Sequence, residues 1–448
     1  MECHVFDSDD VEFNGELQRM RKLRCCALAC FLLVALQLAG APRNAPRNSS
    51  PLPGKWIATW AASPQSAAPD PHEPLLNIED QTVRERVRVS IGGTQIRIRL
   101  SNEYGSSPVL IGSASVGVPI DPASVRSSSI QTVTFGGRSS VTIPAGAPLL
   151  SDPVAFPVSS GAQISISLYF PKRIATPTWH ELALKRAVVS QRGDYTHAEK
   201  IENGAGSKSS ILISAVLVPA QASQRLVVAF GDSVTDGDGS SVDADHNWPS
   251  DLIRRLGKTP EASKVAVVNA GIVGNRLLND CFIANAGCFS ISALARFDRD
   301  ALALPGVTHI VLLEGINDIG FPGANLDGTY LAPPTDVRSP DDLVDAYLQL
   351  ISRAHAHGVK VIGATISPFE GVDLPGYYSE SKEELRQTIN KWIRISGSFD
   401  GVIDFDAVLR DPDHPTRLLP RLASKDHLHP NDEGYQAMAD AIDLTLFN

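Results

Sequence analysis

The sequence has no excess of positive charge and no long apolar runs. Its 448 residues carry 40 basic and 50 acidic side chains, which gives a net charge of −10. Nucleic-acid binding depends on clustered Lys and Arg, so this balance argues against a nucleic-acid partner. Hydrophobic residues at 43% and charged residues at 20% exclude a disordered polyanion, a collagen-like fibre or a coiled coil. The length predicts two or three domains.

The apolar run near the N-terminus, from Cys25 to Leu38, is about fourteen residues long, whereas a transmembrane helix needs roughly twenty. Basic residues precede this run and small residues follow it: Arg21, Lys22 and Arg24, then Ala39-Gly40-Ala41. This pattern is typical of a secretory signal peptide. We therefore expect residues 1–41 to be an N-terminal extension with a signal peptide around 20–41, and the protein to be secreted or periplasmic, without stable membrane insertion. A permanent N-terminal anchor is the alternative.

Cysteine is scarce, and four of the six cysteines fall in this segment: Cys3, Cys25, Cys26 and Cys30. The remaining two, Cys281 and Cys288, are seven residues apart and are candidates for a disulfide, with free buried thiols as the alternative. Two cysteines without a nearby pair of histidines make a poor zinc site, so no metal is predicted.

Residues 42–54 are a Pro-rich linker, and residues 55–220 alternate apolar and polar side chains with a period of two. Many short strands with Gly, Pro and Ser turns predict an antiparallel β-sandwich. The runs on either side of Gly92-Gly93 predict a hairpin with one buried face. Five arginines alternate along these strands: Arg84, Arg86, Arg88, Arg97 and Arg99. We expect them to lie on a solvated strand face. Contact with an anionic polymer or with the second domain is the alternative.

From residue 221 to residue 448, strand-length apolar runs alternate with amphipathic stretches. The expected strands are Leu226–Phe230, Val265–Asn269, His309–Glu314, Lys360–Ser367 and Val402–Phe405. The clearest helix runs from Ser339 to about His357 and ends before Gly358. This alternation predicts a three-layer α/β/α domain with a parallel sheet, in which ligands bind at the carboxyl ends of the strands.

Polar motifs follow two of these strands, and a third motif lies near the C-terminus. Gly231-Asp232-Ser233 follows the first strand, although a serine there often only caps a helix. Gly315-Ile316-Asn317-Asp318 follows the third strand and alone is an ordinary turn sequence. Asp426 lies three residues before His429, close enough to bond its Nδ1 atom and fix the tautomer.

Four sequence blocks occur in order: FGDSVTDG, NAGIVGNR, EGINDIG and DHLHPNDEGY. Together they resemble the SGNH (GDSL) hydrolase family over residues 224–448, including secreted bacterial members with an N-terminal β-rich domain. The resemblance implies that Ser233 is the nucleophile and His429 the general base, oriented by Asp426. It also implies an oxyanion hole made by Ser233, Gly274 and Asn317.

The resemblance implies a serine esterase that acts on short- to medium-acyl carboxylic esters of small molecules or polysaccharides, including carbohydrate O-acetyl esters, without a cofactor. A lipid esterase of the lysophospholipase type is one alternative. A non-catalytic surface protein that binds glycans through the β-sandwich is the other. The sequence does not specify the oligomeric state.

Acidic residues crowd the loop after the expected nucleophile: Asp236, Asp238, Asp243 and Asp245. A calcium loop of the EF-hand type beginning at Asp236 would need different residues at 240, 241 and 247, where the chain has Ser240, Ser241 and Asn247. We therefore expect a solvated acidic loop.

The two C-terminal histidines provide a test of this interpretation. His429→Ala should lower kcat by several orders of magnitude, because a serine hydroxyl is a weak nucleophile without its base. His427→Ala should have little effect, because His427 lies outside the family motif. Steady-state hydrolysis of p-nitrophenyl acetate measures both variants, and reversed effects would assign the base to His427.

Overall fold

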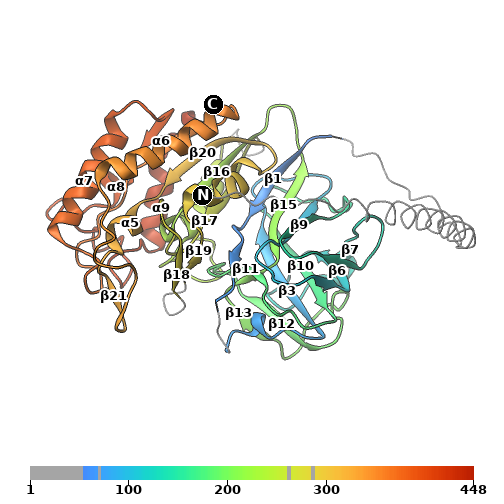
Figure 1. The fold of residues 1–448 in the computed structure, drawn as a ribbon. Helices are drawn as coiled ribbons and strands as arrows, with labels where there is room; N and C mark the ends of the chain where they lie inside the picture. Colours follow the sequence, from blue (N-terminus) through green and yellow to red (C-terminus); the bar gives the residue numbers. More distant parts are fainter. Residues whose placement is uncertain (1–53, 69–71, 260–263, 284–287) are drawn as a thin grey trace, which may run out of the picture. The chain divides into compact units, whose positions relative to one another are not determined.

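The computed structural model describes residues 54–68, 72–259, 264–283 and 288–448. The predicted signal peptide and all but the last residue of the predicted linker lie outside these ranges. The described chain begins with a β-rich region and continues as an α/β region, shown in blue to green and in yellow to red in Figure 1.

The β-rich region consists of antiparallel sheets, as predicted. One sheet has the strand order β1 (Trp56–Ala61), β15 (Ile213–Pro219), β4 (Arg97–Asn102) and β9 (Ala147–Leu150). A larger sheet has the order β13 (Ala205–Ser207), β12 (Ala187–Arg192), β3 (Gln81–Arg88), β10 (Gln163–Phe170), β6 (Ser113–Gly117) and β7 (Gln131–Thr132). Three short strands form a third sheet in the order β14 (Ser210–Ile211), β11 (Thr178–His180) and β2 (Gln65–Ser66), and β5 (Val109–Ile111) pairs with β8 (Val141–Ile143). The sandwich packing of these sheets stays a prediction.

The hairpin predicted around Gly92-Gly93 is wrong. Strand β3 pairs with β10 and β12, whereas β4 pairs with β15 and β9, so the connection passes from one sheet to another. A Cβ atom at Gly92 would lie 2.4 Å from the carbonyl oxygen of Val158. The glycine is therefore required by close packing of the crossing chain and not by a two-residue hairpin turn.

The expectation of a solvated arginine face is also wrong. The Arg84 side chain is fully buried and donates hydrogen bonds to Ser167 and to four backbone carbonyls, those of Ala123, Tyr195, Ala198 and Glu199. Arg86 and Arg88 form ion pairs with Asp243 and Asp245 of the α/β region, each at 2.7 Å. These arginines therefore join chain segments instead of facing solvent.

The α/β region is built on a parallel sheet, as predicted. Its order is β17 (Val265–Gly271), β16 (Arg225–Gly231), β20 (Val307–Leu313), β23 (Lys360–Ala364) and β24 (Gly401–Ile403). Its helices are α2 (Ser233–Asp236), α3 (Trp248–Leu256), α4 (Ala293–Phe297), α5 (Ile316–Gly320), α6 (Pro340–Ala356), α7 (Glu380–Ile395), α8 (Phe405–Leu409) and α9 (Asp432–Ala441). Two short pairs are antiparallel: β18 (Cys281–Ile283) with β19 (Cys288–Ser290), and β21 (Asn325–Leu326) with β22 (Thr329–Tyr330).

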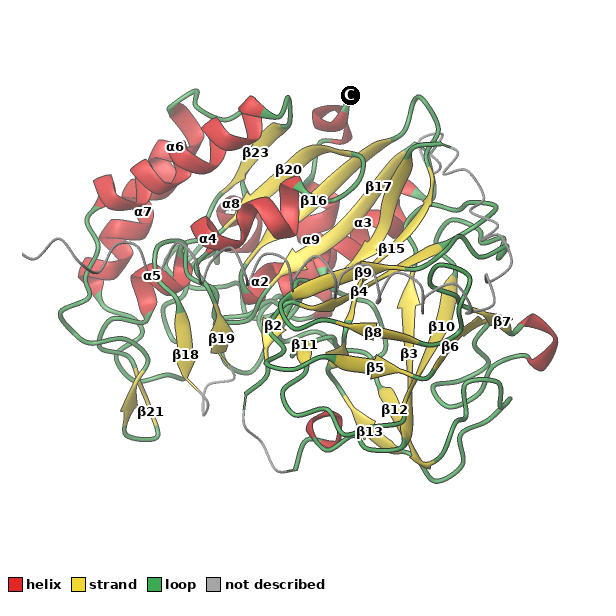
Figure 2. Ribbon diagram, turned by 45° about the vertical axis from the view of Figure 1, so that its right-hand side comes forward, coloured by secondary structure: helices red, strands yellow, loops and turns green. Residues whose placement is uncertain are grey.

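Alternate residues of the central strands belong to two separate apolar clusters. Val227 and Ala229 of β16 pack with side chains of α3, α8 and α9, whereas Val228 and Phe230 pack with side chains of α4 and α6 and with strands of the β-rich region. The sheet is thus buried on both faces, as parallel sheets generally are. Figure 2 shows the red helices around the yellow parallel strands.

Helix α6 begins where the sequence predicts. The Ser339 side chain accepts a hydrogen bond from the Asp342 N–H, and the Asp342 carboxylate accepts one from the Ser339 N–H, which is a capping box. The helix ends before Gly358, whose φ of 68° suits glycine. Among the described residues, no helix combines the length and apolar character needed to cross a membrane.

The β-rich and α/β regions share one of the two apolar clusters and cover each other's edges. Edge strand β17 would leave unpaired backbone groups, but the N–H of Val267 donates to the Ser90 side chain at 2.8 Å. The Ala58 N–H donates to the Pro305 carbonyl at 2.9 Å. Core residues from both regions pack in the same cluster, so neither half can be removed without exposing apolar surface.

A fragment of residues 221–448 should therefore be much less soluble than the chain 54–448. The reason is that it exposes the open edge of β17 and the apolar face that the β-rich region covers. Binding of the dye ANS and the fraction that elutes as a monodisperse species measure this exposure. A fragment as soluble as the longer chain, with no more ANS binding, would contradict the shared core.

Candidate active site

Ser233 lies at the junction of β16 and α2, at the carboxyl end of the parallel sheet. Asp232 caps the helix: its carboxylate accepts a hydrogen bond from the N–H of Val234 at 2.9 Å. Ser233 is therefore not the cap, and its hydroxyl is free to make another contact. The side chain is almost buried, with 4% of the residue exposed. Its Oγ atom lies 2.8 Å from Nε2 of His429.

His429 is held by the carboxylate of Asp426. The His429 Nδ1 atom lies 2.6 Å from Oδ2 of Asp426. The other carboxylate oxygen accepts hydrogen bonds from the Ser424 hydroxyl at 2.6 Å and from the backbone N–H groups of Leu428 and His429. With the Nδ1 hydrogen donated to Asp426, Nε2 presents a lone pair to the Ser233 hydroxyl. His427 is exposed and has a positive φ of 58°.

The electrostatic surroundings favour the charged form of His429. Burial alone lowers the pKa of the imidazole, but the hydrogen bond that it donates to Asp426 and the nearby carboxylates of Asp238 and Asp232 raise it above its ordinary value. Asp238 lies 3.8 Å from Nε2, on the side that faces Ser233. Although burial opposes it, the bond to His429 holds the pKa of Asp426 well below its usual range.

Asn317 enters the site from α5, directly after β20. Its Nδ2 atom donates to the carbonyl of Asn275 at 2.9 Å, and its Oδ1 atom accepts from the Tyr377 hydroxyl at 2.8 Å. These two bonds fix the orientation of the amide. An amide nitrogen has two hydrogens, and in the part of the chain that the structure describes no second acceptor is bonded to this one.

Gly274 lies in the turn after β17, with a φ of 67° that favours glycine. The chain just beyond this turn is fixed by Asp318, the residue after Asn317. Its carboxylate accepts hydrogen bonds from the N–H groups of Leu277 at 2.6 Å and Leu278 at 3.0 Å. The turn of Gly274 and the helix of Asn317 are thereby joined.

Sequence reasoning missed several buried residues that hold these pieces together. Besides Asp318 and Tyr377, they include Arg296, whose guanidinium is fully buried and donates to the Gly231 and Ala270 carbonyls at 2.8 Å. Burial raises the pKa of Asp232 to about 7 and that of Glu314 well above its usual range. In the sequence, the only indication of these buried charged residues is the position of Glu314 at the end of a predicted strand.

The acidic loop predicted to be solvated is instead largely paired. Asp243 pairs with Arg86, and Asp245 pairs with Arg88 and with Lys185, which lies 2.7 Å away. Asp236 is buried against His180. No three His, Cys, Asp or Glu side chains of the described residues are grouped so as to hold a metal ion. Cys281 is disulfide-bonded; the side chain of its predicted partner, Cys288, lies outside the described residues.

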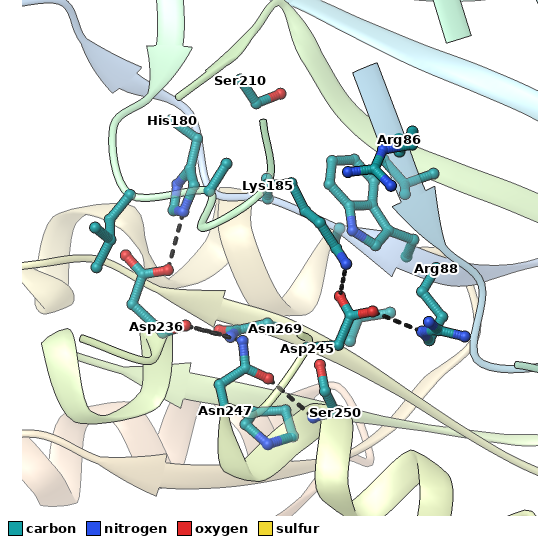
Figure 3. A pocket seen from close by; sticks show the side chains of 18 of the residues that line it. Arg86, Arg88, His180, Lys185, Ser210, Asp236, Asp245, Asn247, Ser250 and Asn269 are labelled. Atoms are coloured by element: carbon teal, nitrogen blue, oxygen red, sulfur yellow. Dashed lines mark hydrogen bonds and ion pairs between the residues drawn. The ribbon is translucent and has the colours of Figure 1, made fainter. Parts of the chain in front are cut away.

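A cavity of about 90 Å³ lies between the β-rich region and the α/β region, and Asp236 of α2 is part of its lining. Figure 3 shows its charged lining, with His180 directed at Asp236 and Lys185 and Arg88 directed at Asp245. A second cavity, of about 350 Å³, is bordered by Asp318, the loop before α6 and the start of α7.

Residues 229–437 match the GDSL-like Lipase/Acylhydrolase family. A solved structure of a protein of the lipolytic G-D-S-L family from Desulfitobacterium hafniense DCB-2 is 24% identical, covers 49% of this chain and 97% of its own, and has a TM-score of 0.34. A solved structure of a catalytic mutant of an acetylxylan esterase from Geobacillus stearothermophilus is 19% identical and has a TM-score of 0.36. The match covers 49% of this chain and 92% of that esterase. A comparison with curated proteins found no match.

The matched segment begins in the strand that leads to Ser233 and includes Asn317, Asp426 and His429. Residues 229–437 are therefore a GDSL-like lipase/acylhydrolase domain, and the protein is an ester-hydrolysing enzyme.

Proposed function

We propose that the protein hydrolyses carboxylic esters through a Ser233-His429-Asp426 triad. The observation that carries this proposal is the continuous pair of short bonds, 2.8 Å from Ser233 to His429 and 2.6 Å from His429 to Asp426. A serine hydroxyl becomes an effective nucleophile when an adjacent base removes its proton, and a carboxylate on the far nitrogen stabilises the resulting imidazolium.

In the first half-reaction, Ser233 Oγ attacks the carbonyl carbon while His429 Nε2 takes the hydroxyl proton. The imidazolium then gives this proton to the leaving alkoxide oxygen, the ester C–O bond breaks, and an acyl-Ser233 intermediate remains. In the second half-reaction, His429 takes a proton from water, which attacks the acyl carbon. Collapse of the tetrahedral intermediate returns the proton to Ser233 and releases the carboxylic acid.

The negative charge on the tetrahedral oxygen needs preorganised donors. The second Nδ2 hydrogen of Asn317 is well suited, because Tyr377 and the Asn275 carbonyl already fix the amide before the substrate binds. The backbone N–H of Ser233, at the start of α2, is the second donor. The role of Gly274 as a third donor follows from the family resemblance and stays a prediction.

The proposed substrates are short- to medium-acyl esters, including carbohydrate O-acetyl esters, and secretion stays part of the proposal. A panel of acetylated sugars, lysophospholipids and p-nitrophenyl esters of graded chain length separates this class from lipid esters. Activity confined to long-chain lipids would favour the lipid esterase.

Ser233→Ala tests the function directly. The variant should lose ester hydrolysis and covalent labelling by a fluorophosphonate, while its Tm changes little because only one hydroxyl is removed. Ser240→Ala, a change in the nearby loop, provides the matched control and should be labelled normally. Labelling of Ser233→Ala at the wild-type level would rule out Ser233 as the nucleophile.

The pH dependence tests the role of Asp426. Because His429 must be neutral to act as a base and its pKa is raised, kcat/KM should fall on the acid side with a midpoint above the ordinary value of about 6.5. Asp426→Asn removes the charge that raises this pKa, so the midpoint should move to lower pH and kcat should fall by up to ~10⁴-fold. A midpoint that stays in place in this variant would contradict the pairing.

A further inference from the structure

His180, a residue of the β-rich region, reaches the end of the helix that begins with Ser233. It lies at the end of β11, and its Nε2 atom is 3.0 Å from Oδ1 of Asp236, the last residue of α2. Its Nδ1 atom is 3.0 Å from the carbonyl oxygen of Ser63. Both side chains are buried, with 8% of His180 and 4% of Asp236 exposed. Figure 3 shows the two side chains pointing toward one another.

The two partners of His180 require it to donate from both ring nitrogens. A backbone carbonyl and an ionised carboxylate are both acceptors, so with Asp236 ionised both bonds form only with the imidazolium. Burial lowers the pKa of His180, but the charge and hydrogen bond of Asp236 more than offset this and raise it above the ordinary value. Burial also raises the pKa of Asp236, and the charge and hydrogen bond of His180 oppose that rise. The two side chains therefore stabilise each other's charged forms across the two regions of the chain.

Asp236 is itself a junction between the nucleophile helix and the neighbouring strand. Its carbonyl accepts hydrogen bonds from Asn247 at 3.0 Å and from Asn269 of β17 at 3.1 Å. A Cβ atom at Gly271 would lie 2.3 Å from the Asp236 nitrogen, so the end of β17 packs directly on this residue. Gly271 leads into the turn that contains Gly274, and the whole of α2 spans only four residues.

We propose that His180 is a positioning residue for the esterase reaction. By holding the Asp236 carboxylate, it fixes the end of α2 against β17, and so sets the distance between Ser233 and the turn of Gly274. The β-rich region thus takes part in catalysis without touching the substrate. This inference rests on the proposed function, since it concerns the placement of the same nucleophile.

Two substitutions of His180 separate this role from simple filling of space. Gln places its amide nitrogen near the position of the His Nε2 atom and can still donate to Asp236. Asn is shorter, and its amide nitrogen lies near the position of Nδ1, so it can reach only the Ser63 carbonyl. Both remove the positive charge and both are smaller than His, so they differ chiefly in which bond they keep.

Arg86→Met is the matched control for the interface. It removes another ion pair between the two regions, the 2.7 Å contact with Asp243. Asp243 keeps its bonds to the backbone N–H and the side chain of Arg186, so its loop stays attached. A fall in kcat that merely reflects a weaker interface between the two regions should appear in Arg86→Met as well.

We expect His180→Asn to lower kcat by about ten- to a hundredfold with KM changed less than about threefold, because a small displacement of the nucleophile mainly affects the transition state. His180→Gln and Arg86→Met should keep kcat within about threefold of wild type. The rate of fluorophosphonate labelling should follow kcat in all three variants. Kinetics are measured with p-nitrophenyl acetate on the full chain, with Tm recorded for each variant.

Wild-type kcat in a folded His180→Asn variant would overturn the proposal, and so would equal losses in the Asn, Gln and Met variants. If His180→Asn does not fold, His180→Gln decides: a loss of more than about tenfold at an unchanged Tm overturns the proposal, and retained kcat supports it. Ser233→Ala distinguishes a failure of the proposed function from a failure of the positioning role of His180. Activity in that variant refutes the proposed function, whereas its inactivity beside an unaffected His180→Asn refutes only the positioning role.

Discussion

The arrangement of the site depends on one buried guanidinium, that of Arg296. Parallel strands that end side by side direct carbonyl groups to the same edge, where they need donors. Arg296 donates to the carbonyls of Gly231 at the end of β16 and Ala270 near the end of β17, and its charge meets Glu314, just after β20, at 3.2 Å. A third donor, Nε, reaches the Asn275 side chain beside the Gly274 turn. One side chain thus connects the three strand ends that carry the motifs.

A buried cation of this kind is stable only with its partners. Glu314 and Asp300 supply carboxylates, and the Phe230 ring lies 4.0 Å below the guanidinium. Breaking such a buried pair costs about 3–5 kcal/mol, because the remaining charge has no water to solvate it. Burial and the neighbouring carboxylates of Asp232 and Asp318 raise the pKa of Glu314, whereas the charge and hydrogen bond of Arg296 oppose this rise. The rigidity of the strand ends therefore depends on the pairing of Arg296 with acidic residues from other elements of the fold.

The sequence predicts those structural features that depend on residues close together in the chain. The five parallel strands follow from apolar runs, the start of α6 from its capping residues, and the approach of Asp426 to His429 from their spacing of three. It does not predict the partners of buried polar groups, because these come from distant segments. Arg84 and Arg86 fall on the same alternating face of a strand, as solvated side chains do, yet strands and loops more than a hundred residues away cover them. Arg296 likewise resembles an ordinary residue of an amphipathic helix.

The β-rich region illustrates the same limit of local patterns. The alternation of apolar and polar residues along its strands indicates that each strand has one buried face. It does not indicate that the α/β region buries part of that face. Ser63, Ser90 and His180 from this region contact Arg296, Val267 and Asp236, respectively. All three contacts lie on the elements that hold Ser233 and its neighbouring strand ends, and none involves Ser233 or His429 itself. The β-rich region is therefore part of the scaffold around Ser233, the proposed nucleophile.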